Sequence, residues 1–270
     1  MVCAMLLMLD IQDFTDKIAD EEIKFLSQPG EDPDKPSRSN RYVFLDELLL
    51  ATDNRTVIRS ELLNILLAGR DTTASLLSNL MWELSRQPAM LARLRQEINT
   101  HIGTDLPTYH QLKDLKYLRA LINESQRMYP IVPTNARQAL KDTILPRGGG
   151  PDGESPLLVP EGAYVAYHSW SMHRRPDIYG EDAHVFEPAR WLDEGHPASP
   201  LRPGWGYIPF SGGPRICIGQ NFALTECMFV VVRLVQMFEI EGRDAEPWRE
   251  ALSVTCSGLG GCKVGLTPWC

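Results

Sequence analysis

The feature that most constrains the fold is a long helix predicted for residues 56–87. Only scattered polar residues interrupt the apolar run at 62–84, a pattern typical of a helix surrounded by a large core. Pro88 cannot continue this helix but suits the first turn of another, so we expect the helix to end at Gln87. At about 1.5 Å per residue, a helix of this length spans roughly 45 Å, the width of a domain. We therefore expect the fold to be built around this central helix.

Further helices are predicted downstream of the central helix. Residues 88–101 form the next one, and a capping box of Thr108 and Gln111 opens a third that runs to Tyr129. Another helix that is apolar on most sides is predicted for residues 218–238.

Short strands are predicted in two regions of the chain. Between residues 131 and 167, turn-forming segments at 148–153 and 160–162 separate the strands. The tail at 252–266 is predicted to form a hairpin with a glycine turn. At the other end of the chain, residues 27–42 are expected to form a loop between two short helical stretches.

Composition narrows the class of protein. Of 270 residues, 43% are hydrophobic and 23% charged, which is enough to bury a sizeable core. The net charge is −8, and the basic residues form no long run, so a nucleic-acid partner is not expected. Residues 1–9 are apolar but too short to span a membrane and lack the marks of a signal peptide.

The six cysteines carry no pattern of a disulfide framework or a zinc site. They include no C-x-x-C pair, and no histidine follows any of them at zinc-ligand spacing. Reduced thiols in a cytosol-facing protein are the better interpretation.

The most specific segment is Phe-Ser-Gly-Gly-Pro-Arg-Ile-Cys-Ile-Gly at residues 210–219, directly before the last apolar helix. A thiolate at Cys217 would be stabilised there by the unpaired N–H groups and the positive dipole of a helix N-terminus. Gly213 and Gly219 permit turns and close approach, and Arg215 can meet an anionic group on a flat cofactor. Taken alone, a cysteine before a helix is more often a buried structural residue, here in a glycine-rich loop.

The complete string F-x-x-G-x-R-x-C-x-G resembles the haem-ligand segment of cytochromes P-450, the haem-thiolate monooxygenases. The resemblance implies that the chain binds haem b and that the thiolate of Cys217 ligates the iron. It also implies that Phe210, Gly213, Arg215 and Gly219 form the loop around the cofactor.

A second segment, Ala-Gly-Arg-Asp-Thr-Thr at residues 68–73, lies within the central helix. Glycine in a helix interior costs about 1 kcal/mol relative to alanine, and an unpaired carboxylate among apolar residues costs more. A polar helix face is one explanation. The family resemblance implies another, in which Ala68, Gly69 and a local distortion of the helix make room for dioxygen. Asp71 would then relay protons, and the Thr72 hydroxyl would stabilise the oxygen-bound state.

A third group of residues is expected to support the fold. Glu124 and Arg127 share a helix face, and the segment 186–191 resembles the family segment whose arginine, here Arg190, joins that pair in a buried network. Arg137 matches a family position that often meets a haem propionate, although a surface arginine on a strand is an equal alternative.

Two other patterns are given no catalytic role. His168, His173 and His184 fit no single helix face, so solvated or hydrogen-bonded roles are expected for them. Gly-Leu-Gly-Gly at residues 258–261 opens no helix and is not a dinucleotide fingerprint.

The family resemblance runs from about residue 40 to residue 266, and its closest likeness is to the fungal alkane- and fatty-acid-hydroxylating branch. That finer likeness rests on the strings at 145–153, 172–175 and 205–207. Family members are much longer, and the part ahead of the central helix normally supplies a membrane anchor, sheet strands and a substrate lid. The chain is therefore expected to be mainly α with small β hairpins, the C-terminal portion of the family's α+β prism. We expect one partial domain over 1–270, with lead-in helices and a loop over 1–55 and the haem-binding region over 56–270.

The resemblance implies a monooxygenase that inserts one atom of dioxygen into a C–H bond of a lipophilic substrate, a fatty acid or an alkane. Electrons would come from NADPH through a flavoprotein reductase. The longer protein would lie on the endoplasmic reticulum membrane. A haem-binding fragment without turnover is one alternative, and a haem-thiolate isomerase or peroxide-using enzyme is another. The pair Asp71 and Thr72 favours oxygen activation over the latter, and we expect it to face one cavity with Cys217.

Overall fold

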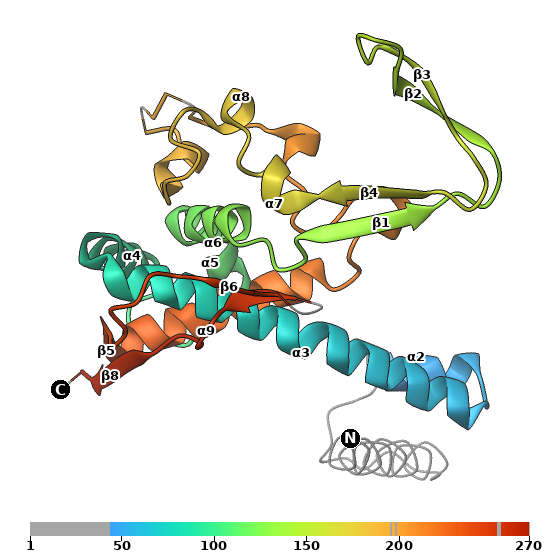
Figure 1. The fold of residues 1–270 in the computed structure, drawn as a ribbon. Helices are drawn as coiled ribbons and strands as arrows, with labels where there is room; N and C mark the ends of the chain where they lie inside the picture. The colour runs from blue at the N-terminus through green and yellow to red at the C-terminus, as the bar shows by residue number, and fades with distance from the viewer. Residues whose placement is uncertain (1–43, 195, 198, 253–254, 270) are drawn as a thin grey trace. The chain divides into compact units, whose positions relative to one another are not determined.

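The computed structural model describes residues 44–194, 196–197, 199–252 and 255–269 (Figure 1). Its contacts divide the chain within helix α3 (Arg55–Arg86) into two compact units, one reaching to Asp71 and the other running from Thr72 onward. The loop and short helices predicted ahead of residue 44 lie outside the described residues. Among the described residues, none of the helices combines the length and the apolar character needed to cross a membrane.

In the first unit, α2 (Phe44–Ala51) packs against the beginning of α3. Leu45 and Ile58 are buried at this contact. The first turn of α3 is capped by Asn54, whose side-chain oxygen accepts hydrogen bonds from the amides of Thr56 at 3.0 Å and Val57 at 3.3 Å. This cap fixes where the central helix begins.

Helix α3 has the predicted bounds but not the predicted burial. Residues 64–71 are all exposed, which is more than two full turns of helix. The three large apolar residues there, Ile65, Leu66 and Leu67, are 47%, 47% and 53% exposed. The prediction of a helix buried along its whole apolar run is therefore wrong for these turns, because no described residue packs around them.

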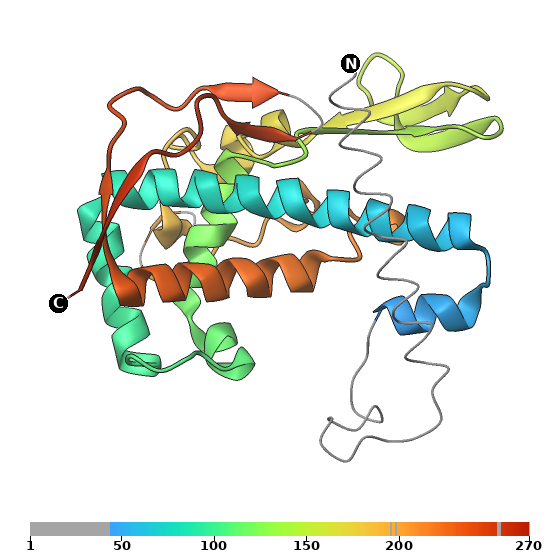
Figure 2. The ribbon, with the colours of Figure 1, turned by 90° about the horizontal axis from the view of Figure 1, so that it is seen from below.

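The main core lies in the second unit, between the C-terminal half of α3 and three other helices. These are α4 (Pro88–His101), α6 (Lys116–Met128) and α9 (Gln220–Met237), and Figure 2 shows α9 running beside α3. The helices bury large aliphatic side chains against one another, including Leu80, Leu94, Leu118, Leu121 and Val231. The predicted helices at 88–101 and 218–238 are thus confirmed.

The third predicted helix is in fact two helices. The capping box of Thr108 and Gln111 is present and opens α5 (Tyr109–Asp114). The helix ends at Leu115, whose backbone is not helical, and α6 then begins. The carboxylate of Glu97 on α4 accepts hydrogen bonds from the amides of Tyr117 at 2.7 Å and Leu118 at 3.0 Å. A side chain from another helix thus caps α6, so the prediction of one continuous helix to Tyr129 is wrong.

The strands predicted between residues 131 and 167 form two antiparallel pairs. Strand β1 (Thr134–Gln138) pairs with β4 (Tyr164–His168), with Ala136 opposite Ala166. Between them in sequence, β2 (Thr143–Gly149) pairs with β3 (Ser155–Val159), which Figure 1 shows as a hairpin continuing outward from the first pair.

The tail differs from the predicted hairpin at 252–266. Strand β8 (Val264–Pro268) pairs with β5 (Phe238–Gly242), the strand that follows α9 directly. Strand β7 (Cys256–Gly258) pairs instead with β6 (Glu250–Leu252). Gly260 and Gly261 have positive φ and turn the chain between the two pairs. The tail thus belongs to two sheets because β5 offers it a strand edge that the local sequence does not reveal.

Several short elements connect β4 to α9 and carry most of the polar contacts described next. They are α7 (Ser169–Met172), α8 (Pro176–Tyr179), η2 (Pro188–Trp191), η3 (Gly204–Gly206) and η4 (Gly213–Arg215).

Candidate functional site

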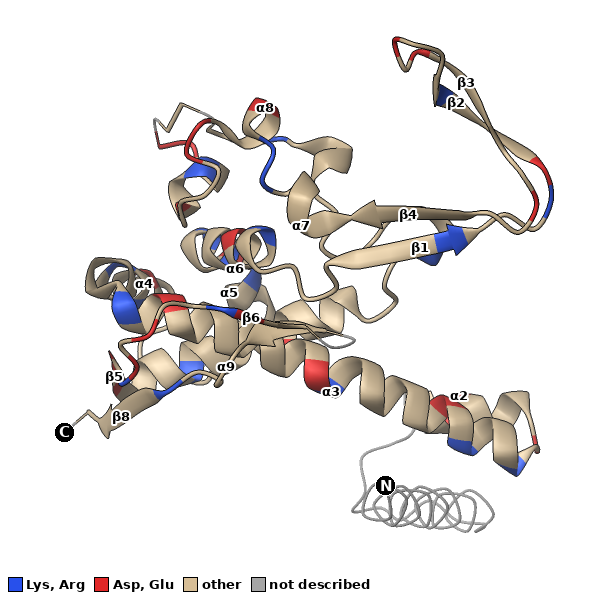
Figure 3. Cartoon of the chain, viewed as in Figure 1, with Lys and Arg blue, Asp and Glu red and all other residues tan. Residues whose placement is uncertain are grey.

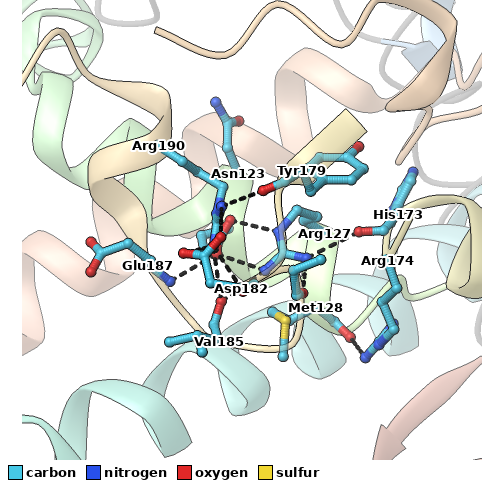
Figure 4. A network of polar contacts seen from close by, with 12 residues as sticks. Asn123, Arg127, Met128, His173, Arg174, Tyr179, Asp182, Val185, Glu187 and Arg190 are labelled. Atoms are coloured by element: carbon cyan, nitrogen blue, oxygen red, sulfur yellow. Dashed lines mark hydrogen bonds and ion pairs between the residues drawn. The ribbon is translucent and has the colours of Figure 1, made fainter. Parts of the chain in front are cut away.

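A fully buried carboxylate, Glu124 on α6, lies at the centre of a polar network. Figure 4 shows Arg127, Arg190 and other residues of this network. It accepts two hydrogen bonds of 2.8 Å from the guanidinium of Arg127 and one of 3.0 Å from that of Arg190. The backbone amide of Glu187 and the indole N–H of Trp191 each donate to it at 2.8 Å. The structure thus brings together the three residues that the sequence grouped and satisfies the buried charge of Glu124 with five donors.

The same two arginines hold the connecting segment against α6 through its carbonyl groups. Arg127 donates to the carbonyl oxygens of His173 at 3.0 Å and Val185 at 2.9 Å. Arg190 donates to the carbonyl oxygen of Tyr179 at 2.8 Å. Because a guanidinium presents several donors in a rigid plane, each arginine fixes a carboxylate and a loop backbone at once.

The cysteine loop, residues 210–219, lies directly ahead of α9. Gly213 has a φ of +68°, a left-handed conformation that favours glycine, and Gly219 is the N-cap of α9. The amide of Cys217 donates to the carbonyl oxygen of Phe210 at 2.9 Å, so the loop closes on itself. The Cys217 residue is exposed. The unpaired N–H groups in the first turn of α9 favour negative charge beside this end of the helix.

The surface around Cys217 is apolar and exposed. Ile218 and Phe222 are 93% and 72% exposed, and Ile216 is 48% exposed. Helix α9 carries only two charged residues, Glu226 and Arg233. Its ribbon is accordingly mostly tan in Figure 3, where charged residues are blue or red. Arg215 is exposed, and none of the residues that the structure describes forms an ion pair with it. A thiol, an apolar surface and a free cation together fit a flat apolar cofactor that carries anionic groups.

The start of the cysteine loop and the stretch just before it are fastened by aromatic side chains. The hydroxyl of Tyr167 on β4 is 2.8 Å from that of Ser211, the one non-glycine residue with positive φ among those described. The hydroxyl of Tyr207 donates to the carbonyl oxygen of Asn123 at 3.1 Å. Sequence reasoning assigned no role to these residues, because each contact joins positions far apart in the chain.

Two further anchors come from α8 and from the end of α7. The hydroxyl of Tyr179 donates to the carbonyl oxygen of Gly206 at 2.8 Å. The amide of Ile208 donates to Nε2 of His173 at 3.1 Å. Three histidines were considered from the sequence. His173 is buried, whereas His168 and His184 are exposed. The described residues contain no group of three or more His, Cys, Asp or Glu side chains that could hold a metal ion.

The segment 68–73 is regular helix throughout. The local distortion implied by the resemblance is therefore not present in this structure. A side chain at Gly69 would meet nothing within 4 Å beyond its own helix, so no neighbour forces a distortion there. The Asp71 side chain is 58% exposed and lies 3.0 Å from the guanidinium of Arg70, and Thr72 is half-buried. That these residues share a cavity with Cys217 stays a prediction.

Arg137 lies exposed on β1, where its guanidinium donates to the side chain of Asn135 at 2.9 Å and to the carbonyl oxygen of Ala136 at 2.8 Å. Both bonds are local. A contact between Arg137 and a propionate therefore stays a prediction.

The comparisons with known proteins identify the family. The family model described as "Cytochrome P450" matches residues 7–255, and the chain belongs to this family. Membership implies a haem iron, and the predicted family resemblance is confirmed.

Similar curated proteins come from fungi. The chain is 48% identical over 237 residues to "Cytochrome P450 monooxygenase fsdH" of Fusarium heterosporum, covering 86% of this chain and 41% of that protein. It is 48% identical over 222 residues to "Cytochrome P450 52A6" of Candida tropicalis, covering 80% of this chain and 41% of the relative. The chain thus spans about two fifths of the length of these relatives.

A solved structure supports the fold. The crystal structure of a cytochrome P450, CYP102L1, matches with a TM-score of 0.77 at 26% identity, covering 96% of this chain and 55% of that one. The expected fold class, mainly α with small β hairpins, is confirmed.

The buried network gives the first testable prediction. Glu124→Gln leaves the buried guanidinium of Arg127 without its counter-charge and that of Arg190 with only Asp182, so we expect it to lower the free energy of unfolding by about 3–5 kcal/mol in urea denaturation. The control is Asp177→Asn, which removes a partner of Arg175 in an ion pair that is 56% and 60% exposed. That change should leave the free energy of unfolding nearly unchanged, because the pair is surrounded by solvent. Equal losses in the two variants would contradict the role of Glu124.

His173 gives a second prediction, on pH. Burial lowers the pKa of His173 from 6.5 to about 4, and the charges of Arg127 and Arg174 act in the same direction. Because the unfolded chain binds the proton more readily, stability is fully present above pH 6.5 and is lost as the pH falls toward 4. The loss attributable to His173 should reach about 3 kcal/mol.

Urea denaturation at several pH values checks this prediction. The pH dependence of stability should become shallower between pH 6.5 and 4 in His173→Gln and stay unchanged in His184→Gln, a matched change at an exposed site. A His173→Gln profile parallel to that of the unaltered chain would show that His173 protonates freely in the folded state.

Proposed function

We propose that this chain is the haem-binding part of a monooxygenase that inserts one atom of dioxygen into a C–H bond of a lipophilic substrate. The observation that carries the proposal is the exposed Cys217 at the amino end of α9, within an exposed apolar surface. The substrate class, a fatty acid or an alkane, follows from the resemblance to the fungal hydroxylating branch. Relatives named cytochrome P450 52A, among them proteins of Candida tropicalis and Candida maltosa, agree with a fungal branch.

The residues around Cys217 would each contribute to holding haem. The Cys217 thiolate supplies the ligand and its negative charge, and the positive end of α9 stabilises that charge. Arg215 pairs with a carboxylate on the cofactor, with Arg137 as a second candidate. Phe210, Gly213 and Gly219 shape the loop so that the backbone can approach a flat ring. When bound, haem supplies the iron chemistry that activates dioxygen.

The proton chemistry falls to the helix segment with Asp71 and Thr72, next to the small residues Ala68 and Gly69. A carboxylate exchanges protons with water, and a hydroxyl both donates and accepts, so the pair can pass protons inward one at a time. Electrons are supplied from NADPH by a flavoprotein reductase, since the sequence shows no nicotinamide or flavin fingerprint.

A second candidate is a haem-binding chain without turnover. The bare turns of α3 at 64–71 favour it, because Ile65, Leu66 and Leu67 are about half exposed and offer no dry surroundings for the chemistry. Exposed apolar surface of this kind ordinarily requires a further protein surface. Stoichiometric haem with no product, measured on residues 1–270 with added reductase, would select this candidate.

Ligation by Cys217 is tested by spectroscopy. The chain reconstituted with haem, reduced and exposed to carbon monoxide should show a Soret band at the position specific for a thiolate ligand. In Cys217→Ala the band should move to the position of a neutral ligand, because no thiolate remains. Cys227→Ala, which removes a buried thiol within α9, is the control and should keep the thiolate band. A thiolate band that survives Cys217→Ala excludes Cys217 as the ligand.

Proton delivery is tested by measuring how much product forms for each NADPH consumed. Thr72→Ala should leave haem content and NADPH consumption near normal but raise hydrogen peroxide several-fold and lower product per NADPH, because the hydroxyl no longer guides the proton. Thr73→Ala, the same change at the buried neighbour, should leave coupling unchanged. The measurement needs a preparation that turns over, so it uses this chain with reductase or a longer protein that contains it. Unaltered coupling in Thr72→Ala would reduce Thr72 to helix packing.

A further inference from the structure

Two buried residues connect the charge network around Glu124 to the cysteine loop. Each of them is held through its backbone by an arginine of the network, and its side chain bonds a residue just ahead of the loop, Gly206 or Ile208. The pattern occurs at His173 and again at Tyr179, and Figure 4 shows both beside Arg127 and Arg190. The inference drawn from it rests on the proposed function of Cys217.

At His173, the carbonyl oxygen accepts a hydrogen bond from Arg127 at 3.0 Å, while Nε2 accepts one from the amide of Ile208 at 3.1 Å. The side chain is fully buried, and its ring packs against that of Tyr207 with centroids 5.2 Å apart. An imidazole whose Nε2 is an acceptor is neutral and carries its proton on Nδ1. The Ile208 residue itself is half-buried, and its amide donates to this ring nitrogen.

At Tyr179, the carbonyl oxygen accepts from Arg190 at 2.8 Å, and the hydroxyl donates to the carbonyl oxygen of Gly206 at 2.8 Å. Its ring lies under the guanidinium of Arg127, 5.2 Å from the ring centre to the central carbon. Tyr179 is also fully buried. Two independent paths therefore run from the arginines to the backbone between Gly206 and Ile208.

The position of that backbone determines the position of the cysteine. Phe210 follows two residues after Ile208, and its carbonyl oxygen accepts the hydrogen bond from the Cys217 amide at 2.9 Å. Ser211, which follows Phe210, has a φ of +63°, an unfavourable conformation for a residue other than glycine. Its hydroxyl is held by the hydroxyl of Tyr167. A loop under such constraint moves as one piece when its base moves.

We propose that His173 and Tyr179 are positioning residues, which transmit the rigidity of the Glu124 network to the cysteine loop and so hold Cys217 where it can ligate iron. Neither residue touches the cofactor site itself. Packing alone would require only aromatic rings at these two places. Transmission of rigidity from the Glu124 network to the cysteine loop requires in addition the acceptor atom of His173 and the hydroxyl of Tyr179.

Hydrogen–deuterium exchange on the haem-free chain tests the coupling without any cofactor. His173→Phe keeps a ring but removes the acceptor, and we expect the Ile208 amide to exchange about tenfold faster, as for the loss of one hydrogen bond. His173→Gln returns an acceptor oxygen and should restore most of the protection. Exchange in α4, away from the loop, should stay the same in both variants.

Tyr179→Phe removes a single hydroxyl and preserves the core, so it keeps the test usable if His173→Phe does not fold. It should speed exchange across residues 206–217 several-fold. The control is Tyr164→Phe, the same change at an exposed position on β4, and it should have no effect there. Unchanged exchange of this segment in both His173→Phe and Tyr179→Phe overturns the proposal, and so does an equal increase throughout the core helices.

The carbon monoxide spectrum of the haem-loaded chain gives the second readout. His173→Phe and Tyr179→Phe should shift part of the population from the thiolate band to the neutral-ligand band, and His173→Gln should shift less. If the unaltered chain shows no thiolate band, the proposed function fails while the exchange result stands. A full thiolate band in variants whose loop exchanges faster would show that loop rigidity does not govern ligation, and would overturn the proposal.

Discussion

The structure of the second unit depends on one buried carboxylate. Taking the charge of Glu124 out of water costs several kcal/mol, and only a complete set of donors offsets such a cost. Arg127, Arg190, the Glu187 amide and the Trp191 indole supply that set. Because these donors lie on α6 and on η2 far along the chain, the carboxylate can be satisfied only when both segments have folded onto each other. The network thus specifies one arrangement of a region that has little regular secondary structure.

The network also explains how a chain segment with only short helices can be rigid. Between β4 and α9 the backbone makes few ladder or helical hydrogen bonds, so its carbonyl groups need other donors. The two arginines provide them at His173, Tyr179 and Val185. Side chains of the same segment then fasten the residues before Cys217. Individual hydrogen bonds therefore connect the Glu124 network to the cysteine loop, and the loop's conformation depends on each of them.

The sequence predicted those features that depend on neighbouring residues. The capping box of Thr108, the bounds of α3 and α4 and the turns between strands follow from local chemistry. The division between α5 and α6 was missed because its cap, Glu97, belongs to another helix. The pairing of β8 with β5 was missed for the same reason, since an open strand edge is created only by folding.

The candidate site divides in the same way. The motif around Cys217 could be recognised because its residues are contiguous. Glu124 and Arg127 could be paired from their helix spacing, and Arg190 joined them only through the family resemblance. His173 and Tyr179 carried no local signal, because a histidine or tyrosine in a loop has many possible partners and the sequence does not rank them. The burial of α3 was overestimated. An apolar sequence predicts that other residues pack against the helix, but none of the described residues bury residues 64–71.

The contrast between the two sides of the cysteine loop follows from what a metal ligand requires. The inner side is fixed by partly buried hydrogen bonds at residues 206–211, whereas the outer side presents Ile216, Cys217 and Ile218 to the surface. A thiol enclosed by protein could not reach a cofactor. A thiol on an unsupported loop would bind one more weakly, because binding would have to order the loop. Hydrogen bonds on the inner side alone hold the loop in place and leave the thiol accessible, so both requirements are met. Gly213 fits this division, because it turns the chain on the open side, where a side chain would meet nothing within 4 Å.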